Sequence, residues 1–144
     1  MAERDSWQAR GRALVAAAGA GRALVLDEPL SFWGGLDAAS GRIIDRRHPQ
    51  AGEDVAGRVL VMPAGRGSSS SSSVLAEAIR LGTGPAAILL SRADEIIVLG
   101  ALVVDLLYGA TCPVVLLDGA DYDRLRTGDA VAVEPAGGVT VSPA

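Results

Sequence analysis

A run of six serines, Ser68–Ser73, follows Gly65-Arg66-Gly67 and leads directly into a helical pattern. Hydroxyls and free backbone N–H groups at the positively polarised start of a helix can bind an anion or hold a serine that does chemistry. A flexible Gly/Ser linker is a third interpretation, but neither half of the chain has an independent folding pattern. Helix capping needs fewer serines than six. The segment therefore predicts a strand-to-helix turn whose hydroxyls face a ligand.

Activation of such a serine requires more than a helix terminus. The helix dipole contributes about 0.3–1 kcal/mol near an exposed end, which is less than one pK unit. Arg66 adds one cation. The remaining stabilisation of an ionised serine would have to come from a base, a metal or a desolvated pocket. The remainder of the sequence contains few residues that could supply such a base, metal site or pocket.

His48 is the only histidine, and it stands three residues after Asp45. A Ser–His–Asp hydrolase could be assembled from Ser68, His48 and Asp45. The Gly-x-Ser-x-Gly pattern of a nucleophile elbow is absent, and Asp-x-x-His in a turn is more often a local hydrogen-bonded structure. A standalone serine hydrolase remains one alternative.

Two large aromatic residues stand beside paired glycines in Phe32-Trp33-Gly34-Gly35. Paired glycines indicate tight backbone turns, so residues 29–41 are predicted to form a shaped loop. We expect Phe32 and Trp33 to pack in this loop or at an interface, not to stack on nucleic-acid bases.

The bulk composition predicts one soluble domain. The chain has 144 residues, a net charge of −4, 49% hydrophobic and only 3% aromatic residues. Because the sequence has no concentrated basic segment, we do not expect nucleic acid as a partner. The single Cys112 excludes an internal disulfide and a self-contained zinc or iron–sulfur site, and a buried structural thiol is expected. No signal peptide is evident and the apolar stretch 96–108 is too short to span a bilayer, so we expect a cytoplasmic protein without membrane contact.

The elements that position these residues alternate between strands and helices. A helix is predicted from the serines to Gly82, and another over residues 94–108, where a strand is the competing interpretation. Residues 1–20 are weakly patterned, and residues 118–129 form a loop with one helical turn. Strands are predicted at 22–27, 42–45, 58–62, 86–90, 113–117, 131–133 and 139–141. This order is typical of an α/β domain with a mixed sheet, plus a partly separate β layer from the first and last thirds.

Several of these motifs, in this order, resemble the small swivelling domain of aconitase X over about residues 10–141. The residues that carry the resemblance are Leu30-Ser31-Phe32-Trp33-Gly34-Gly35, Asp37, Ile43-Ile44-Asp45, His48-Pro49, Gly65-Arg66-Gly67-Ser68-Ser69, Pro85-Ala86-Ala87-Ile88, Gly100-Ala101-Leu102-Val103 and Pro113-Val114-Val115. The resemblance implies a swivelling β/β/α fold, one swivel domain over residues 1–144, and a role in dehydration.

The resemblance also implies site residues. A serine in a Gly-x-Gly-Ser-Ser turn abstracts the substrate proton in the wider aconitase superfamily, and the matching residue here is Ser68. Aconitases follow the paired serines with Arg-Glu, whereas Ser70 and Ser71 stand there in this chain. Substrate recognition must therefore differ from that of citrate or isopropylmalate. The matching substrate-binding positions are Arg66, Gly67, Ser69, Trp33, Gly34, Gly35 and His48.

A catalytic partner follows from the same resemblance. The small domain closes over a large one that carries an iron or iron–sulfur centre, so this chain is expected to hold no cofactor and to act as the small subunit of a two-chain hydro-lyase. The family dehydrates cis-3-hydroxy-L-proline or mevalonate 5-phosphate. The lysine-free, Arg- and Ala-rich composition and the single nearby cation, Arg66, favour hydroxyproline. The alternatives are a phosphomevalonate dehydratase small subunit and a non-enzymatic interaction module.

Overall fold

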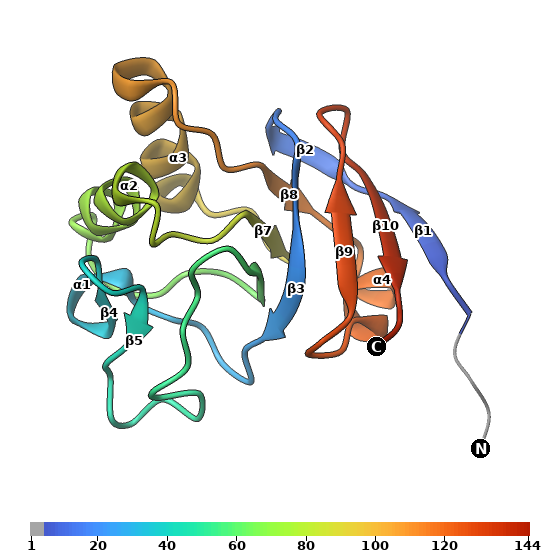
Figure 1. The fold of residues 1–144 in the computed structure, drawn as a ribbon, viewed down its shortest axis with the longest axis horizontal. Coiled ribbons are helices and arrows are strands. Elements are labelled where there is room, and N and C mark those ends of the chain that lie inside the picture. Colours follow the sequence, from blue (N-terminus) through green and yellow to red (C-terminus); the bar gives the residue numbers. More distant parts are fainter. Residues whose placement is uncertain (1–4) are drawn as a thin grey trace.

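A central layer of parallel strands separates a pair of helices from a second β layer. The computed structural model describes residues 5–144, and Figure 1 shows α2 and α3 on one side of the central strands and β9, β10 and β1 on the other. The elements are β1 (Trp7–Arg10), β2 (Arg12–Val15), β3 (Gly19–Val25), α1 (Phe32–Gly35), β4 (Leu36–Asp37), β5 (Arg42–Ile43), β6 (Val59–Met62), α2 (Ser71–Leu81), β7 (Ala87–Leu90), α3 (Glu95–Tyr108), β8 (Val114–Leu116), α4 (Gly119–Arg124), β9 (Ala130–Val133) and β10 (Gly138–Ser142). The predicted β/β/α arrangement is confirmed.

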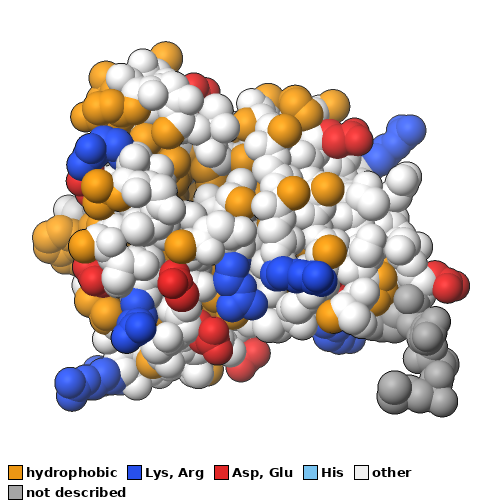
Figure 2. Space-filling model, viewed as in Figure 1, with side chains coloured by type: hydrophobic (Ala, Val, Ile, Leu, Met, Phe, Trp, Pro, Cys, Tyr) orange, Lys and Arg blue, Asp and Glu red, His pale blue; other side chains and the backbone are white. Residues whose placement is uncertain are grey.

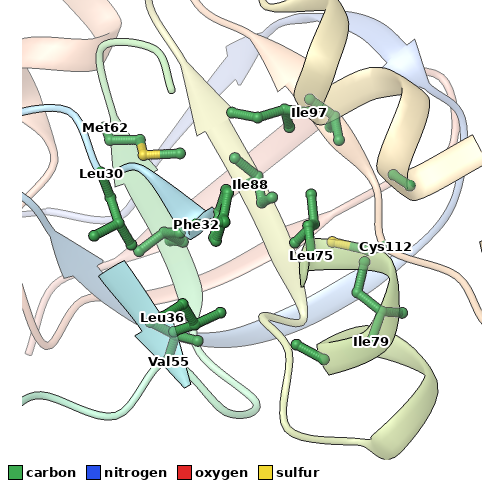
Figure 3. Close-up of a cluster of buried hydrophobic side chains, with 14 of the residues drawn as sticks. Leu30, Phe32, Leu36, Val55, Met62, Leu75, Ile79, Ile88, Ile97 and Cys112 are labelled. Carbon is green, nitrogen blue, oxygen red and sulfur yellow. The ribbon is translucent and has the colours of Figure 1, made fainter. Parts of the chain in front are cut away.

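The central strands are buried on both faces, and this explains their continuous apolar sequences. In β6, Leu60 and Met62 face a helix-side cluster, while Val59 and Val61 face a second cluster between the two β layers. Strand β7 alternates in the same way. Because successive side chains point to opposite faces, a strand covered on both sides needs apolar residues at every position. Figure 3 shows the helix-side cluster, which includes Leu30, Phe32, Met62, Leu75, Ile88, Ile97 and Cys112.

Strands β1 and β2 close the sheet, although only Gly11 separates them. The strand order is β1-β10-β9-β3-β6-β7-β8-β2, so these neighbours in sequence lie at opposite ends of the order. β1 pairs antiparallel with β10, and β2 pairs antiparallel with β8. The Gly11 amide donates to the Gly137 carbonyl at 2.9 Å. The weakly patterned N-terminal segment therefore contains two strands, β1 and β2, which meet at Gly11 and join both β layers.

Five other parts of the chain can be compared with the predicted elements. Helix α2 begins at Ser71, so three of the six serines lie inside it. Residues 95–108 form a helix, as predicted, and not the competing strand. Helix α4 is the single helical turn expected after residue 118. The loop predicted over residues 29–41 contains α1 and β4. Residues 131–133 and 139–141 fall in an antiparallel pair, as predicted.

Helices α2 and α3 pack closely where the sequence supplies glycine. A Cβ at Gly100 of α3 would lie 2.8 Å from the Ser72 carbonyl oxygen of α2. The two helices therefore approach almost to backbone contact, and a side chain at this position would push them apart. Within residues 5–144 no helix combines the length and apolar character needed to cross a membrane.

Candidate functional site

The serine segment is an ordered turn and not a linker. Gly67 has φ +98°, a conformation that favours glycine, and the chain enters α2 three residues after Ser68. The Ser68 hydroxyl oxygen accepts a hydrogen bond from the Ser70 amide at 3.1 Å, and the Ser68 carbonyl accepts one from the Ser71 amide at 2.9 Å. The Ser68 side chain is exposed. The turn thus presents this hydroxyl to solvent while a backbone donor contacts its oxygen.

The backbone amides of Gly67, Ser68 and Ser69 form no hydrogen bond with any residue from 5 to 144. They lie just before α2, at the end of the helix where the aligned peptide dipoles produce a partial positive charge. A negatively charged oxygen, either on a ligand or on Ser68 itself, would be stabilised at this end of the helix.

The turn that carries Trp33 lies against the serine segment. Trp33 (φ −69°, ψ 114°) and Gly34 (φ 76°, ψ −12°) have the backbone angles of a type II turn, although the segment is labelled α1 in Figure 1. The Trp33 amide donates to the buried Ser71 hydroxyl at 3.1 Å. A Cβ at Gly67 would lie 2.5 Å from the Ser31 hydroxyl oxygen. The Trp33 side chain, 59% exposed, therefore stands on a turn fixed to the serine segment.

Arg66 is less available to a ligand than its sequence position predicts. Its guanidinium forms a 3.5 Å ion pair with Glu28, and both side chains are about half exposed. The Arg66 amide donates to the Leu30 carbonyl at 3.2 Å, which aligns the serine segment with the residues before α1. An exposed pair of this kind is screened by water, so Glu28 weakens the field of Arg66 without removing its charge.

A cavity of about 40 Å³ lies beneath the turn, with room for no more than a few water molecules. Its walls are formed by Leu30, Phe32, Gly65, Arg66, Gly67, Ser71, Asp94, Ile96 and Ile97. A substrate of several carbon atoms would not fit inside it. Ser68 is not among these wall residues, and its exposed side chain lies on the open side of the turn.

His48 is a structural histidine in this fold. Only 3% of the residue is exposed, and Nδ1 accepts a hydrogen bond from the Gln50 amide at 3.0 Å. Since Nδ1 is an acceptor, the proton lies on Nε2, which contacts the Glu28 carbonyl oxygen at 3.1 Å. Both ring nitrogens are occupied by backbone, so the ring has no nitrogen left for Ser68 or for a substrate. The geometry favours the local hydrogen-bonded interpretation of Asp45-x-x-His48.

Two residues that contact the site were not identified from the sequence as site residues. Ser71 holds the Trp33 turn, and the Asp94 carboxylate accepts a hydrogen bond from the Gly65 amide at 2.9 Å. For Ser71 the sequence contains no local signal, because its burial and its contact with Trp33 arise only in the folded chain. For Asp94, the residues before α3 indicate an N-cap but do not reveal its second contact.

Cys112 belongs to the hydrophobic core and not to the candidate site. The residue is fully buried, and desolvation raises the pKa of its thiol to about 12. Within residues 5–144 no group of three or more His, Cys, Asp or Glu side chains is placed to hold a metal ion.

We expect the native chain to resist thiol reagents. At pH 8, four units below a pKa of about 12, about one Cys112 thiol in ten thousand is ionised, and burial blocks access to it. A disulfide-exchange reagent should label the native chain at least about 100-fold more slowly than the chain in denaturant, where the pKa returns to its ordinary range. Equal rates in the two states would show that Cys112 is accessible.

Comparison with known proteins identifies three close relatives of this domain. The sequence pattern of the aconitase X swivel domain matches residues 8–141. A cis-3-hydroxy-L-proline dehydratase from Pseudomonas aeruginosa is 48% identical over 114 residues, which are 79% of this chain and 20% of that protein. A phosphomevalonate dehydratase small subunit from Methanopyrus kandleri is 40% identical over 119 residues, 82% of this chain and 84% of that protein. The crystal structure of Thermococcus kodakaraensis aconitase X in its holo-form has a TM-score of 0.82 and 33% identity, over 94% of this chain and 98% of that one.

The matched lengths differ between the two groups of relatives. The chain spans about a fifth of the length of the hydroxyproline dehydratases, at 20% and 22%, but 84% of the Methanopyrus kandleri small subunit. The same type of domain therefore occurs both as part of a long protein and as most of a short one.

Proposed function

The chain belongs to the aconitase X swivel-domain family, and we propose that it is the small subunit of a two-chain dehydratase to which it contributes the base. The observation that carries this proposal is the geometry of Ser68. Its hydroxyl is exposed on a turn before α2, and its oxygen accepts a hydrogen bond from the Ser70 amide. A backbone donor at a helix N-terminus favours the ionised form of such an oxygen.

In the proposed reaction, the Ser68 alkoxide takes a proton from a substrate carbon. The electron pair of that C–H bond becomes the second bond to the adjacent carbon, and the hydroxyl on the adjacent carbon departs with its own bonding pair. The proton then lies on Ser68 and combines with the departed hydroxide to give water, so the alkoxide is restored. The Ser70 amide and the start of α2 stabilise the alkoxide before and after the transfer.

The rest of the site must come from a large subunit. Ser68 stands on an open surface, and the helix terminus alone lowers the free energy of an alkoxide by only about 1 kcal/mol. A large subunit that covers the turn would exclude water and strengthen each of these interactions. The iron or iron–sulfur centre of the proposed enzyme would also lie there, because the described residues have no cluster of suitable ligands.

Exposed apolar side chains support a protein partner. Leu106, Leu107 and Tyr108 at the end of α3 are 85%, 68% and 63% exposed, and Figure 2 shows hydrophobic atoms gathered over this end of the molecule. Large exposed apolar patches mark interaction surfaces more often than free surfaces. As part of the same proposal, residues 1–144 form a single swivel domain that works in the cytoplasm, and a free buried cysteine is compatible with reducing conditions there.

We propose cis-3-hydroxy-L-proline as the substrate. The 48% identity to the Pseudomonas aeruginosa dehydratase supports this choice, as does the ion pair between Arg66 and Glu28. A phosphorylated substrate would need cations that are free to pair with phosphate, and Glu28 competes for this one. The alternative is mevalonate 5-phosphate, which the relatives named as small subunits support.

Reconstitution with a large aconitase X subunit tests the proposal. The chain alone should be inactive, and the mixture should dehydrate cis-3-hydroxy-L-proline with a kcat/KM at least about 100-fold above that for mevalonate 5-phosphate. The reverse preference would select the alternative substrate. Ester cleavage by the isolated chain would favour a serine hydrolase, and an assembled complex that turns over neither compound would favour an interaction module.

A further inference from the structure

We propose that Asp94 is a positioning residue for the turn that carries Ser68. Its carboxylate ties Gly65, where the turn begins, to the start of α3. The consequence for catalysis rests on the proposed function, whereas the tie itself can be measured in the full chain without a partner.

The Asp94 carboxylate accepts three backbone hydrogen bonds from two segments. Its Oδ1 accepts from the Ile96 amide at 3.0 Å and the Ile97 amide at 3.1 Å, as an N-cap does. Its Oδ2 accepts from the Gly65 amide at 2.9 Å, across 29 residues of sequence. The cap uses one oxygen, so the second is available for the serine turn.

The second contact is not a general requirement of helix capping in this chain. Asp118 caps α4 through the Asp121 amide, and its carboxylate has no bond to a distant segment within residues 5–144. The N-cap residue of helix α2, Ser70, forms no side-chain capping hydrogen bond. Asp94 thus combines the capping of α3 with a contact that α3 does not need.

The surroundings of Gly65 show how closely the turn is held. A Cβ at this position would lie 3.0 Å from Asp94 Oδ2 and 3.0 Å from Ile97 Cδ1, so glycine allows the close approach. On its other side Gly65 forms a parallel bridge with Leu30. Only Arg66 and Gly67 separate Gly65 from Ser68, and a misplacement of 1 Å in a catalytic group can reduce a rate about 100-fold. Asp94 therefore fixes the end of the turn from which Ser68 extends.

Two substitutions separate positioning from capping. Asp94→Ser keeps a good N-cap but is too short to reach Gly65. Asp94→Asn keeps one acceptor oxygen, so it can cap α3 or accept from Gly65, but its amide nitrogen replaces the other acceptor. Asp118→Asn is the matched control, because it alters an N-cap remote from the serine turn.

The first readout is the backbone amide of Gly65 in the full chain labelled with ¹⁵N-glycine and ¹⁵N-isoleucine. In Asp94→Ser we expect its proton resonance to move upfield and its hydrogen exchange to become at least about 10-fold faster, because a charge-assisted hydrogen bond is lost. The Ile97 amide should keep its protection, and Asp118→Asn should change neither. An unchanged Gly65 amide in both Asp94 variants would overturn the proposal.

The second readout is turnover with the large subunit. Asp94→Ser should lower kcat at least about 10-fold while KM stays within about 3-fold, because the base is displaced and most substrate contacts are not. A wild-type kcat in a variant whose Gly65 amide has shifted would overturn the positioning role. An inactive wild-type complex would count against the proposed function instead, and the Gly65 amide would still decide whether Asp94 holds the turn.

Discussion

Replacing Ser68 with alanine should lower kcat/KM for dehydration by the proposed two-chain enzyme by about 10²–10⁴-fold, the usual contribution of a general base. The substitution removes the oxygen that takes the proton in the proposed reaction and that accepts a hydrogen bond from the Ser70 amide. Because the side chain is exposed, its loss leaves no buried polar group unpaired and no cavity. Steady-state kinetics of the complex, with thermal unfolding of the chain, measure both effects.

Ser73→Ala is the matched control for this substitution. Ser73 belongs to the same run but is exposed within the first turn of α2, where its hydroxyl forms no hydrogen bond to the residues that the structure describes. It should leave kcat/KM within about 3-fold of wild type, since surface substitutions away from special features have small effects. Equal losses in the two variants would show that the serine run acts as a whole and that Ser68 is not the base.

Gly11→Ala destabilises the fold by about 1–3 kcal/mol, the range found for overpacked positions. Its Cβ would lie 2.2 Å from Val115 Cγ1, 3.0 Å from the Gly137 carbonyl oxygen and 3.1 Å from Leu117 Cδ2. To relieve these contacts the bend between β1 and β2 must open, and this weakens the pairing of β1 with β10 or of β2 with β8. Urea denaturation of the full chain measures the change.

Gly119→Ala is the corresponding control. This glycine begins α4, its φ is not positive, and a Cβ would meet no atom within 4 Å. Alanine there should be neutral or stabilise the chain by up to about 1 kcal/mol, because it reduces the entropy of the unfolded state. A Gly11→Ala chain as stable as wild type would contradict this packing, in which the pairing of β2 with β8 places Val115 beside Gly11 and the Gly137 carbonyl approaches it from the other β layer.

The central layer could be predicted from sequence because burial on both faces leaves a strong local signal. Residues 58–62 and 86–90 are apolar at nearly every position, and each yields a central strand. The closing strand could not be predicted, since residues 1–20 contain alternating Ala, Gly and Arg with few large apolar side chains. The pairing of β1 and β2 depends on the distant strands β10 and β8, near the other end of the sequence.

Some features of the candidate site could likewise be predicted from local sequence, and others arise only from tertiary structure. The Gly-Arg-Gly-Ser-Ser motif and the paired glycines after Trp33 predict two turns from local chemistry alone. Their contact through Ser71, across 38 residues, has no local signature. The Arg66–Glu28 pair and the backbone partners of His48 also arise only from tertiary structure. The sequence therefore identified which residues to consider, and the fold shows which of them are free to meet a ligand.

Transfer of the substrate proton to Ser68 is the central claim, and isotope release tests it most directly. The substrate is cis-3-hydroxy-L-proline deuterated at carbon 2, the carbon next to the one that bears the hydroxyl. The wild-type complex should release deuterium to solvent during turnover, while the Ser68→Ala complex should bind the substrate with a Kd within about 3-fold of wild type and retain the label. Release of deuterium by Ser68→Ala at the wild-type rate would contradict the role of Ser68 as the base.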